Sequence, residues 1–211
     1  MSNSSSPRDY SFIAPFYDRI FNLPLAEGHR KLGQLMSAQT RKRGRRVLEV
    51  GVGSGLTLGH LPKGLLYTGI DINQRMLDIA QQKVSAQGLK GVRLALMDAR
   101  KLSFADESYD LVVASSVISA MDNPMKGFRE MARVTKQGGQ IAVIVNLRRV
   151  NSLRSNLVKW FDPLTRRYLG FRTDLTLASF KRLRNVRLIE HQQVNTLVGM
   201  PLSSFLLFEK L

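Results

Sequence analysis

The residues best suited to chemistry are three glycines and three acids that follow short apolar segments. The run Val47-Leu-Glu-Val-Gly51-Val-Gly53-Ser-Gly55 ends such a segment with glycines at alternate positions. Glycines let the backbone turn sharply there and approach a ligand without Cβ clashes. Asp71 ends the next segment, at roughly the spacing where a carboxylate accepts both ribose hydroxyls of a nucleoside. The sequence therefore predicts a nucleoside-binding turn.

The acids also indicate which nucleoside fits this turn. The spacing G-x-G-x-G lacks the third glycine that lets a helix pack beneath the pyrophosphate of a dinucleotide. Glu49, two residues before Gly51, places near the turn a carboxylate that repels a diphosphate and attracts an ammonium or sulfonium. Asp98, in Met97-Asp98-Ala99, adds an acceptor where an adenine amino group would lie. Taken alone, Asp98 is more typical of an acid in a turn that ends a strand, whereas together with Glu49 and Asp71 at matching strand ends it indicates a cofactor contact.

Segments with the hydrophobic period of a helix alternate with segments typical of buried strands along the part of the chain that must position these residues. The segment Asn73–Gly88 carries its apolar residues on one helical face, with Asn73 as N-cap and Gly88 after the last turn. A second helix around Phe128–Val134 is expected to close at Gly138-Gly139. Helices alternating with short apolar strands predict a doubly wound α/β fold with a mostly parallel sheet. The expected buried strands are 47–51, 66–71, 92–98, 110–114 and 140–146.

The N-terminal flank has a different pattern. Residues 10–39 are interpreted as two helices broken at Pro24, the first of them aromatic. We assign residues 1–40 to an N-terminal helical lid and residues 41–211 to the main domain of one compact unit. The N-terminus is polar without an apolar segment after it, which is unlike a secretory signal.

Charge is the unusual feature of the composition. Lys and Arg number 32 against 16 Asp and Glu, giving a net charge of +16. Such a balance indicates anionic partners, either a membrane surface or nucleic acid. The chain has no cysteine, which excludes a disulfide scaffold, a thiolate metal site and a cysteine nucleophile, and suits a reducing cytoplasm. No metal is expected, and the oligomeric state is left open.

Residues 47–146 resemble a class I S-adenosylmethionine-dependent methyltransferase. The similarity covers Glu49 to Gly55, Asp71-Ile72 and Met97-Asp98-Ala99, together with 110–116 and 133–139. It implies a Rossmann-like sheet of seven strands, completed by an antiparallel hairpin from 186–194 and 204–209, and S-adenosylmethionine as cofactor. The cofactor contacts that it implies are Tyr10, Tyr17, Glu49, Gly51, Gly53, Gly55, Asp71, Ile72, Met76, Asp98, Ala99 and Ser115.

The flanks are similar to those of small soluble bacterial phosphatidylethanolamine N-methyltransferases. The similarity rests on short motifs at 16–21, 27–30, 170–175 and 201–207. It implies a lipid amine as acceptor and a peripheral position on the cytoplasmic side of the inner membrane. Family members tend to carry a histidine after the asparagine that ends the fifth strand, whereas Asn146 is followed here by Leu147.

Roles at the acceptor follow from this hypothesis. Tyr17 is the candidate that orients the amine, and aromatic faces near it suit cationic products. Cationic side chains suit a lipid phosphate. The expected substrate-binding residues are His29, Arg30, Asn146, Arg148, Arg149 and Arg172.

Three alternatives stay open from the sequence. A ribosomal RNA methyltransferase would also account for the positive charge, although Ala114-Ser-Ser-Val117 differs from the loop typical of base amino methylation. A methyltransferase acting on a quinone or another small molecule would use the same scaffold. A basic membrane- or nucleic-acid-binding module with a degenerate cofactor pocket is the non-enzymatic alternative, and the intact Glu49, Asp71 and Asp98 argue against it.

Overall fold

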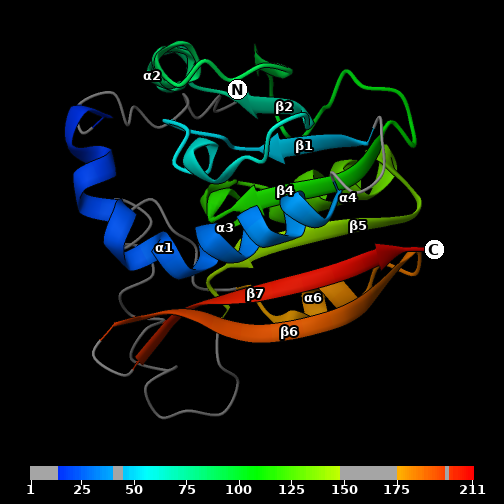
Figure 1. The fold of residues 1–211 in the computed structure, drawn as a ribbon. Coiled ribbons are helices and arrows are strands. Elements are labelled where there is room, and N and C mark those ends of the chain that lie inside the picture. The colour runs from blue at the N-terminus through cyan, green and yellow to red at the C-terminus, as the bar shows by residue number, and fades with distance from the viewer. Residues whose placement is uncertain (1–13, 40–44, 148–174, 198–199) are drawn as a thin grey trace, which may run out of the picture.

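A single sheet of seven strands organises the chain, in the order β3-β2-β1-β4-β5-β7-β6 (Figure 1). The computed structural model describes residues 14–39, 45–147, 175–197 and 200–211. The strands are β1 Arg46–Val50, β2 Leu66–Asp71, β3 Val92–Leu96, β4 Tyr109–Ser115, β5 Thr135–Val145, β6 Val186–Leu197 and β7 Met200–Lys210. The helices are α1 Ala14–Gln39, η2 Leu58–His60, α2 Gln74–Ala86, α3 Val117–Ala120, α4 Pro124–Val134 and α6 Leu177–Lys181.

The pairing confirms the doubly wound, mostly parallel sheet. Strands β1 to β5 pair in parallel, and β7 pairs antiparallel with both β5 and β6. The C-terminal hairpin was expected, and both of its strands are longer than predicted. Chain order reverses between β1 and β4, which makes the carboxyl ends of these two strands the switch point where such sheets bind ligands.

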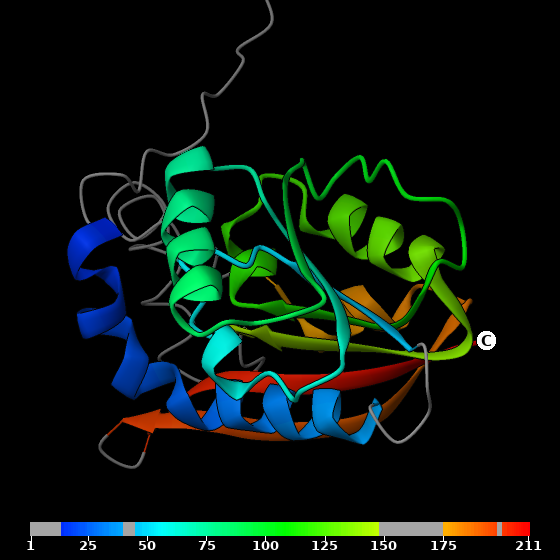
Figure 2. The same cartoon turned by 45° about the horizontal axis from the view of Figure 1, so that its top comes forward.

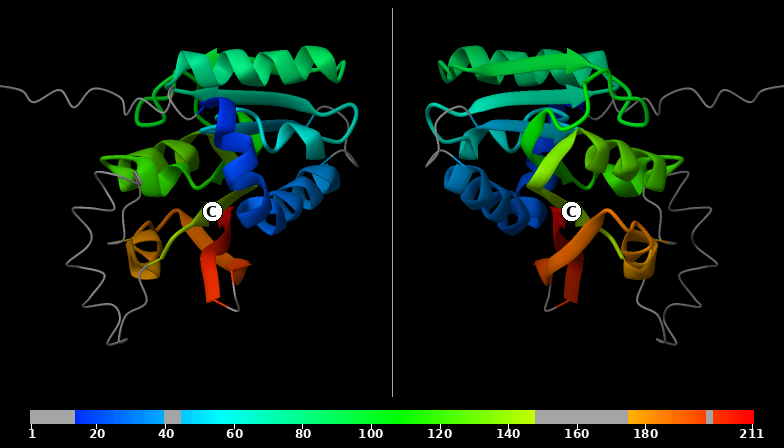
Figure 3. Two further views of the ribbon diagram at one scale, coloured as in Figure 1. Left: turned by 90° about the vertical axis from the view of Figure 1, so that its left-hand side faces the viewer. Right: turned by 90° about the vertical axis from the view of Figure 1, so that its right-hand side faces the viewer.

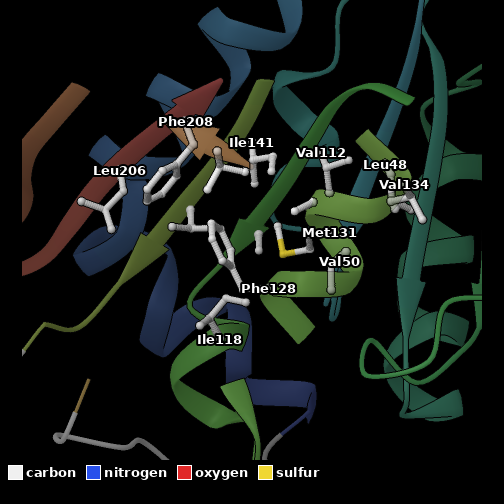
Figure 4. Close-up of a cluster of buried hydrophobic side chains, with 14 of the residues drawn as sticks. Leu48, Val50, Val112, Ile118, Phe128, Met131, Val134, Ile141, Leu206 and Phe208 are labelled. Carbon is white, nitrogen blue, oxygen red and sulfur yellow. The ribbon is translucent and has the colours of Figure 1, made fainter. Parts of the chain in front are cut away.

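Helices cover both faces of the sheet. Helices α4 and α6 lie on one side and α1 on the other (Figure 3). Helix α2 shares the apolar cluster of α1, since Leu32 and Met36 join Leu77 and Ala80 in one buried set. On the opposite face, Phe128 of α4 meets Phe180 of α6 and Phe208 of β7 edge to face. Figure 4 shows this second cluster, in which alternate strand residues such as Leu48 and Val112 contact α4.

Helix α1 corrects the expectation of two helices broken at Pro24. The structure has one helix from Ala14 to Gln39, bent part-way along its length (Figures 1 and 2). Proline lacks the N–H that would continue the helical ladder, and one missing bond bends a helix without ending it when the flanking turns pack well. The second half packs well, because Leu32 and Met36 are fully buried against the sheet.

The predicted ends of two helices were partly correct. Asn73 caps α2 as predicted, because its side chain accepts hydrogen bonds from the N–H groups of Arg75 and Met76, and Gly88 has the left-handed φ of 58° that suits a helix end. Helix α4, however, ends at Val134, and β5 begins at Thr135 before the glycine pair. Tertiary pairing with β4 at Thr135 therefore overrides the glycine signal.

Candidate cofactor and acceptor site

The glycine turn after β1 has the geometry that its composition predicts. Gly51, Gly53 and Gly55 all have positive φ, at 73°, 56° and 79°. The N–H groups of Gly51 and Val52 donate to the carbonyl of Ile70 in β2, at 2.8 and 2.9 Å. A Cβ on Gly51 would lie 2.4 Å from Val117, whereas one on Gly53 would meet nothing within 4 Å. The backbone at Gly53 is thus open to an approaching ligand.

Asp71 connects the ends of β1 and β2. Its carboxylate accepts the N–H of Gly53 at 2.9 Å and the N–H of Asn73 at 2.9 Å. Burial raises the pKa of Asp71, and the backbone donors act against that rise. Because a carboxylate has about four lone-pair sites and the N–H of Ile72 is a third backbone donor, at least one site remains for a ribose hydroxyl. The open Gly53 and the half-buried Asp71 therefore form one edge of a nucleoside seat.

Glu49 lies beneath the turn, inside the protein. Its side chain is 1% exposed, and one oxygen accepts the hydroxyls of Thr57 and Tyr67, each at 2.6 Å. Burial raises the pKa of Glu49 to about 7, against the lowering effect of these hydrogen bonds. In this arrangement the carboxylate holds the turn onto β2 through Tyr67. Direct contact between Glu49 and a ligand stays a prediction.

The predicted adenine side lies along the ends of β2 and β3. Ile72 is 46% exposed, so it offers an apolar surface next to Asp71, whereas Met76 is buried in α2. Asp98 pairs with Arg100, whose Nε and Nη2 lie 3.0 and 2.8 Å from its two carboxylate oxygens. The hydrogen bonds from Arg100 lower the pKa of Asp98. Ala99 is half-buried beside it.

The acceptor side begins where β4 ends. Ser115 is half-buried, and its Oγ lies 3.0 Å from Nε2 of His29 in α1. Ser116 follows with a φ of 61°, rare for a residue with a side chain. Its N–H donates to the carbonyl of Ile144 in β5 at 2.8 Å. A strained turn at the switch point is typical of functional sites.

His29 differs from its expected role at a phosphate. The imidazole is 3% exposed. Burial, with a smaller contribution from nearby His60, lowers the pKa of His29 to about 4. The side chain is therefore neutral at physiological pH and brings no charge to an anion. Arg30, next to it in sequence, is exposed and lines a separate groove of about 380 Å³ with His60.

Two asparagines complete the polar lining at the ends of β5 and β6. Oδ1 of Asn146 accepts the hydroxyl of Ser203 at 3.0 Å, and the Asn146 N–H donates to Oγ of Ser119 at 3.2 Å. Asn195, with a φ of 58°, accepts the N–H of Gly28 through Oδ1 at 2.9 Å. Its buried Nδ2 has no hydrogen-bond partner among the residues that the structure describes. Asn195 therefore fixes α1 to the edge hairpin beside His29.

The remaining candidates fall outside this arrangement. Tyr10, Arg148, Arg149 and Arg172 lie outside the described residues, as does the side chain of Tyr17. Sequence reasoning missed Thr57, Tyr67, Ser119, Asn195 and Ser203. Each is a common residue type with no motif to mark it. Ser119, Asn195 and Ser203 are also 27 or more positions from their partners, so only the tertiary structure brings those pairs together.

Two further features concern the described part of the chain. No group of three metal-ligating side chains occurs there. No helix described in the structure is both long enough and apolar enough to cross a bilayer.

Comparison with known proteins identifies the domain. A family model described as a methyltransferase domain matches residues 48–143, which span the glycine turn, Asp71, Asp98 and Ser115. This match, the curated relatives and the fold together support a class I S-adenosylmethionine-dependent methyltransferase domain. Its fold agrees with that of the solved YcgJ protein from Bacillus subtilis, at a TM-score of 0.67 and 19% identity over 86% of this chain and 98% of that one.

Two curated relatives of this methyltransferase domain differ in the acceptor that their names give. Phosphatidylethanolamine N-methyltransferase of Cereibacter sphaeroides is 44% identical over 109 residues, covering 51% of this chain and 54% of the relative. Demethylmenaquinone methyltransferase of Geobacillus kaustophilus strain HTA426 is 33% identical over 138 residues, covering 63% and 58%. The chain thus spans little more than half the length of the curated relatives it matches.

The residues of the methyltransferase domain fit S-adenosylmethionine as its cofactor. Gly53 gives the backbone an open approach, Asp71 has at least one acceptor site left for a ribose hydroxyl, and exposed Ile72 lies next to it. The third glycine that would let a helix pack beneath a pyrophosphate is missing from the turn, and no cationic side chain binds the carboxylate of Asp71 among the described contacts. The seat therefore suits a nucleoside without phosphates.

Proposed function

We propose that this chain transfers methyl groups from S-adenosylmethionine to the amine of phosphatidylethanolamine and of its partly methylated forms. The observation that carries this choice of acceptor is the 44% identity to a phosphatidylethanolamine N-methyltransferase. The net charge of +16 supports a location at an anionic membrane surface on the cytoplasmic side.

Among the described residues, the polar side chains at the ends of β4 and β5 are uncharged, and the Glu27 carboxylate accepts the N–H of Asn195 beside them. Both features suit an amine acceptor. The uncharged side chains include Ser115 and Asn146, and His29 is neutral, since burial lowers its pKa to about 4. A fixed cation there would repel both an ammonium and a sulfonium. The bound cofactor supplies an electrophilic methyl group on sulfur, so the protein needs chiefly to align the nucleophile and exclude water.

Helix α1 supports the exclusion of water. Its first half stands at the end of the sheet to which the arrow of β1 points (Figure 1). Its second half is fixed by buried Leu32 and Met36 and by Asn195. Lys31 also pairs with Glu190 of β6 and lies 4.4 Å from the ring centroid of Phe205. A helix held in this way can cover the cofactor seat from one side.

The test is to incubate the purified chain with methyl-labelled S-adenosylmethionine and three separate acceptor pools. These are total bacterial lipids, a quinone extract and total RNA. We expect label in mono-, di- or trimethylated phosphatidylethanolamine, identified by mass spectrometry. Asp71→Ala is the control that ties the label to the described cofactor seat. Label only in RNA, or none in lipid, would overturn the proposal.

Quinone methylation is the second candidate, favoured by the 33% identity to a demethylmenaquinone methyltransferase over 138 residues. A ring hydroxyl or ring carbon acceptor would also use uncharged partners. The quinone pool of the same experiment decides between them, because label in quinone without label in lipid supports this candidate alone.

A further inference from the structure

An uncharged pair of side chains, Ser115 at the end of β4 and His29 of α1, lies next to the cofactor seat. Their Nε2 and Oγ atoms lie 3.0 Å apart, although 86 positions separate them in the sequence. The imidazole is almost fully buried, at 3% exposure, while Ser115 is half-buried. Ser115 therefore has one partner inside the protein and keeps part of its surface open.

The position of this pair places it between the cofactor and the acceptor side. Ala114, just before Ser115, pairs with Val50, just before the glycine turn. Gly51 closely approaches Val117, two residues after Ser115, since a Cβ on Gly51 would lie 2.4 Å from it. On the other side, Ser115 pairs with Ile144, two residues before Asn146. The Ser115 hydroxyl thus lies beside the turn that holds the cofactor and beside the polar ends of β5 and β7.

We propose that, in the first two methyl transfers, the Ser115 hydroxyl accepts a hydrogen bond from an N–H of the amine acceptor, and that His29 is the positioning residue that fixes the direction of this hydroxyl. The inference rests on the proposed function. If Ser115 donates its hydrogen to Nε2 of His29, its lone pairs stay free to accept from the amine. If His29 instead donated, the serine hydrogen would compete for the nitrogen lone pair that must attack the methyl group.

The charge of His29 suits this arrangement. Burial keeps the pKa of His29 near 4, so the imidazole has a lone pair at physiological pH and can accept from a serine. The same low pKa makes His29 a poor base for an ammonium. His60 lies in the exposed groove beyond α1. His29 consequently orients a hydroxyl and takes up no proton.

The reaction needs no base from the protein to account for its protons. The acceptor enters the site as a neutral amine after its ammonium has lost a proton to water. The amine nitrogen then forms the bond to the methyl carbon, and the electrons of the carbon–sulfur bond leave with sulfur. The product is a methylated ammonium, and one proton is released to solvent for each methyl group added. Ser115 only keeps the nitrogen lone pair directed at the methyl carbon.

The kinetic test compares Ser115→Ala, His29→Leu, the double variant and His29→Gln, with phosphatidylethanolamine in vesicles as acceptor. Each single variant should lower kcat about 3–10-fold, the range expected for one neutral hydrogen bond. The double variant should lose no more than either single variant, because the two side chains act as one unit. His29→Gln should recover most of the activity, since its amide oxygen also accepts from a serine.

A matched control is available in the edge hairpin. His191 of β6 lies 3.3 Å from Oγ of Ser204, which is a second histidine–serine contact away from the end of β4. His191→Leu should leave kcat within about twofold. Additive losses in His29→Leu and Ser115→Ala, or losses in KM for S-adenosylmethionine alone, would overturn the proposal and give the pair a purely structural role.

A second readout needs no turnover. The chain has three histidines, so nitrogen-15 NMR can assign each imidazole. We expect His29 to carry its proton on Nδ1, with Nε2 as acceptor, and not to titrate between pH 5 and 8. A proton on Nε2 would overturn the proposed direction of the hydroxyl. If the wild-type chain methylates no lipid, the proposed function fails, and this measurement still tests the pair.

Discussion

The cofactor side and the acceptor side of the site are built in different ways. On the cofactor side the partners are close in sequence, and backbone groups do most of the binding, as when the Gly53 N–H meets Asp71 18 positions on. On the acceptor side the contacts join distant segments through side chains. His29 reaches Ser115 across 86 positions, and Asn195 reaches Gly28 across 167.

The difference follows from what each side must recognise. A nucleoside seat needs a backbone that approaches the ligand closely, which consecutive turns of a βαβ unit provide. An acceptor seat varies between enzymes with one fold, so it is made of side chains from elements that can change separately. Substitutions on the cofactor side should therefore act through the backbone, and those on the acceptor side through the packing of α1.

The largest effect is expected from the glycine turn. Gly51→Ala should lower the free energy of unfolding by about 2–4 kcal/mol, because its Cβ would overlap Val117 at 2.4 Å and φ is positive. Gly53→Ala is the matched control, with a positive φ but open space, and should cost only about 1–2 kcal/mol. Gly53→Ala should instead weaken S-adenosylmethionine binding in calorimetry. Equal losses of stability in Gly51→Ala and Gly53→Ala would contradict the conclusion that the space next to Gly53 is open to the cofactor.

The buried acid of the cofactor side should make stability depend on pH. The folded pKa of Glu49 is about 7 against an ordinary 4.5, so the folded chain holds a proton that the unfolded chain loses between these values. The contribution is full below pH 4.5 and is lost as pH rises through 7. Urea unfolding at pH 5 and pH 8 should show a loss on the order of 3 kcal/mol, and Glu49→Gln should remove most of it. An unchanged pH profile in Glu49→Gln would place the titrating group elsewhere.

Asp71→Ala should weaken the affinity for S-adenosylmethionine about 10–150-fold, since a hydrogen bond to a charged group contributes roughly 1.5–3 kcal/mol. Isothermal calorimetry measures this directly. Asp78→Ala provides the control, because Asp78 is an exposed acid of α2 that accepts only from Gln74 among the described contacts. Unchanged affinity in Asp71→Ala would remove this carboxylate from the site.

The smallest effect is expected on the acceptor side. Asn195→Ala should lower the free energy of unfolding by about 1–2 kcal/mol, because it leaves the N–H of Gly28 without its partner and keeps a positive φ. Asn195→Gly should cost less, since glycine tolerates that φ. Both should bind S-adenosylmethionine normally. A comparable loss of cofactor affinity would show that the two sides are not independent.

The sequence by itself determined the sheet, the cofactor turn and the cap of α2. Alternating periods fix strands and helices, and the glycines with Asp71 act over short distances, so their geometry follows from local residue types. The N-cap role of Asn73 is also set by local residues, because its side chain contacts the N–H groups two and three positions further along the chain.

Only the tertiary structure decided the rest. Three features depend on which distant residues pack around them. They are the continuity of α1 past Pro24, the neutral state of His29 and the hydrogen-bond partners of Glu49. The start of β5 at Thr135, before its glycines, depends on pairing with Tyr109. No local pattern encodes these contacts, because burial and sheet pairing contribute more free energy than the propensity of a single residue.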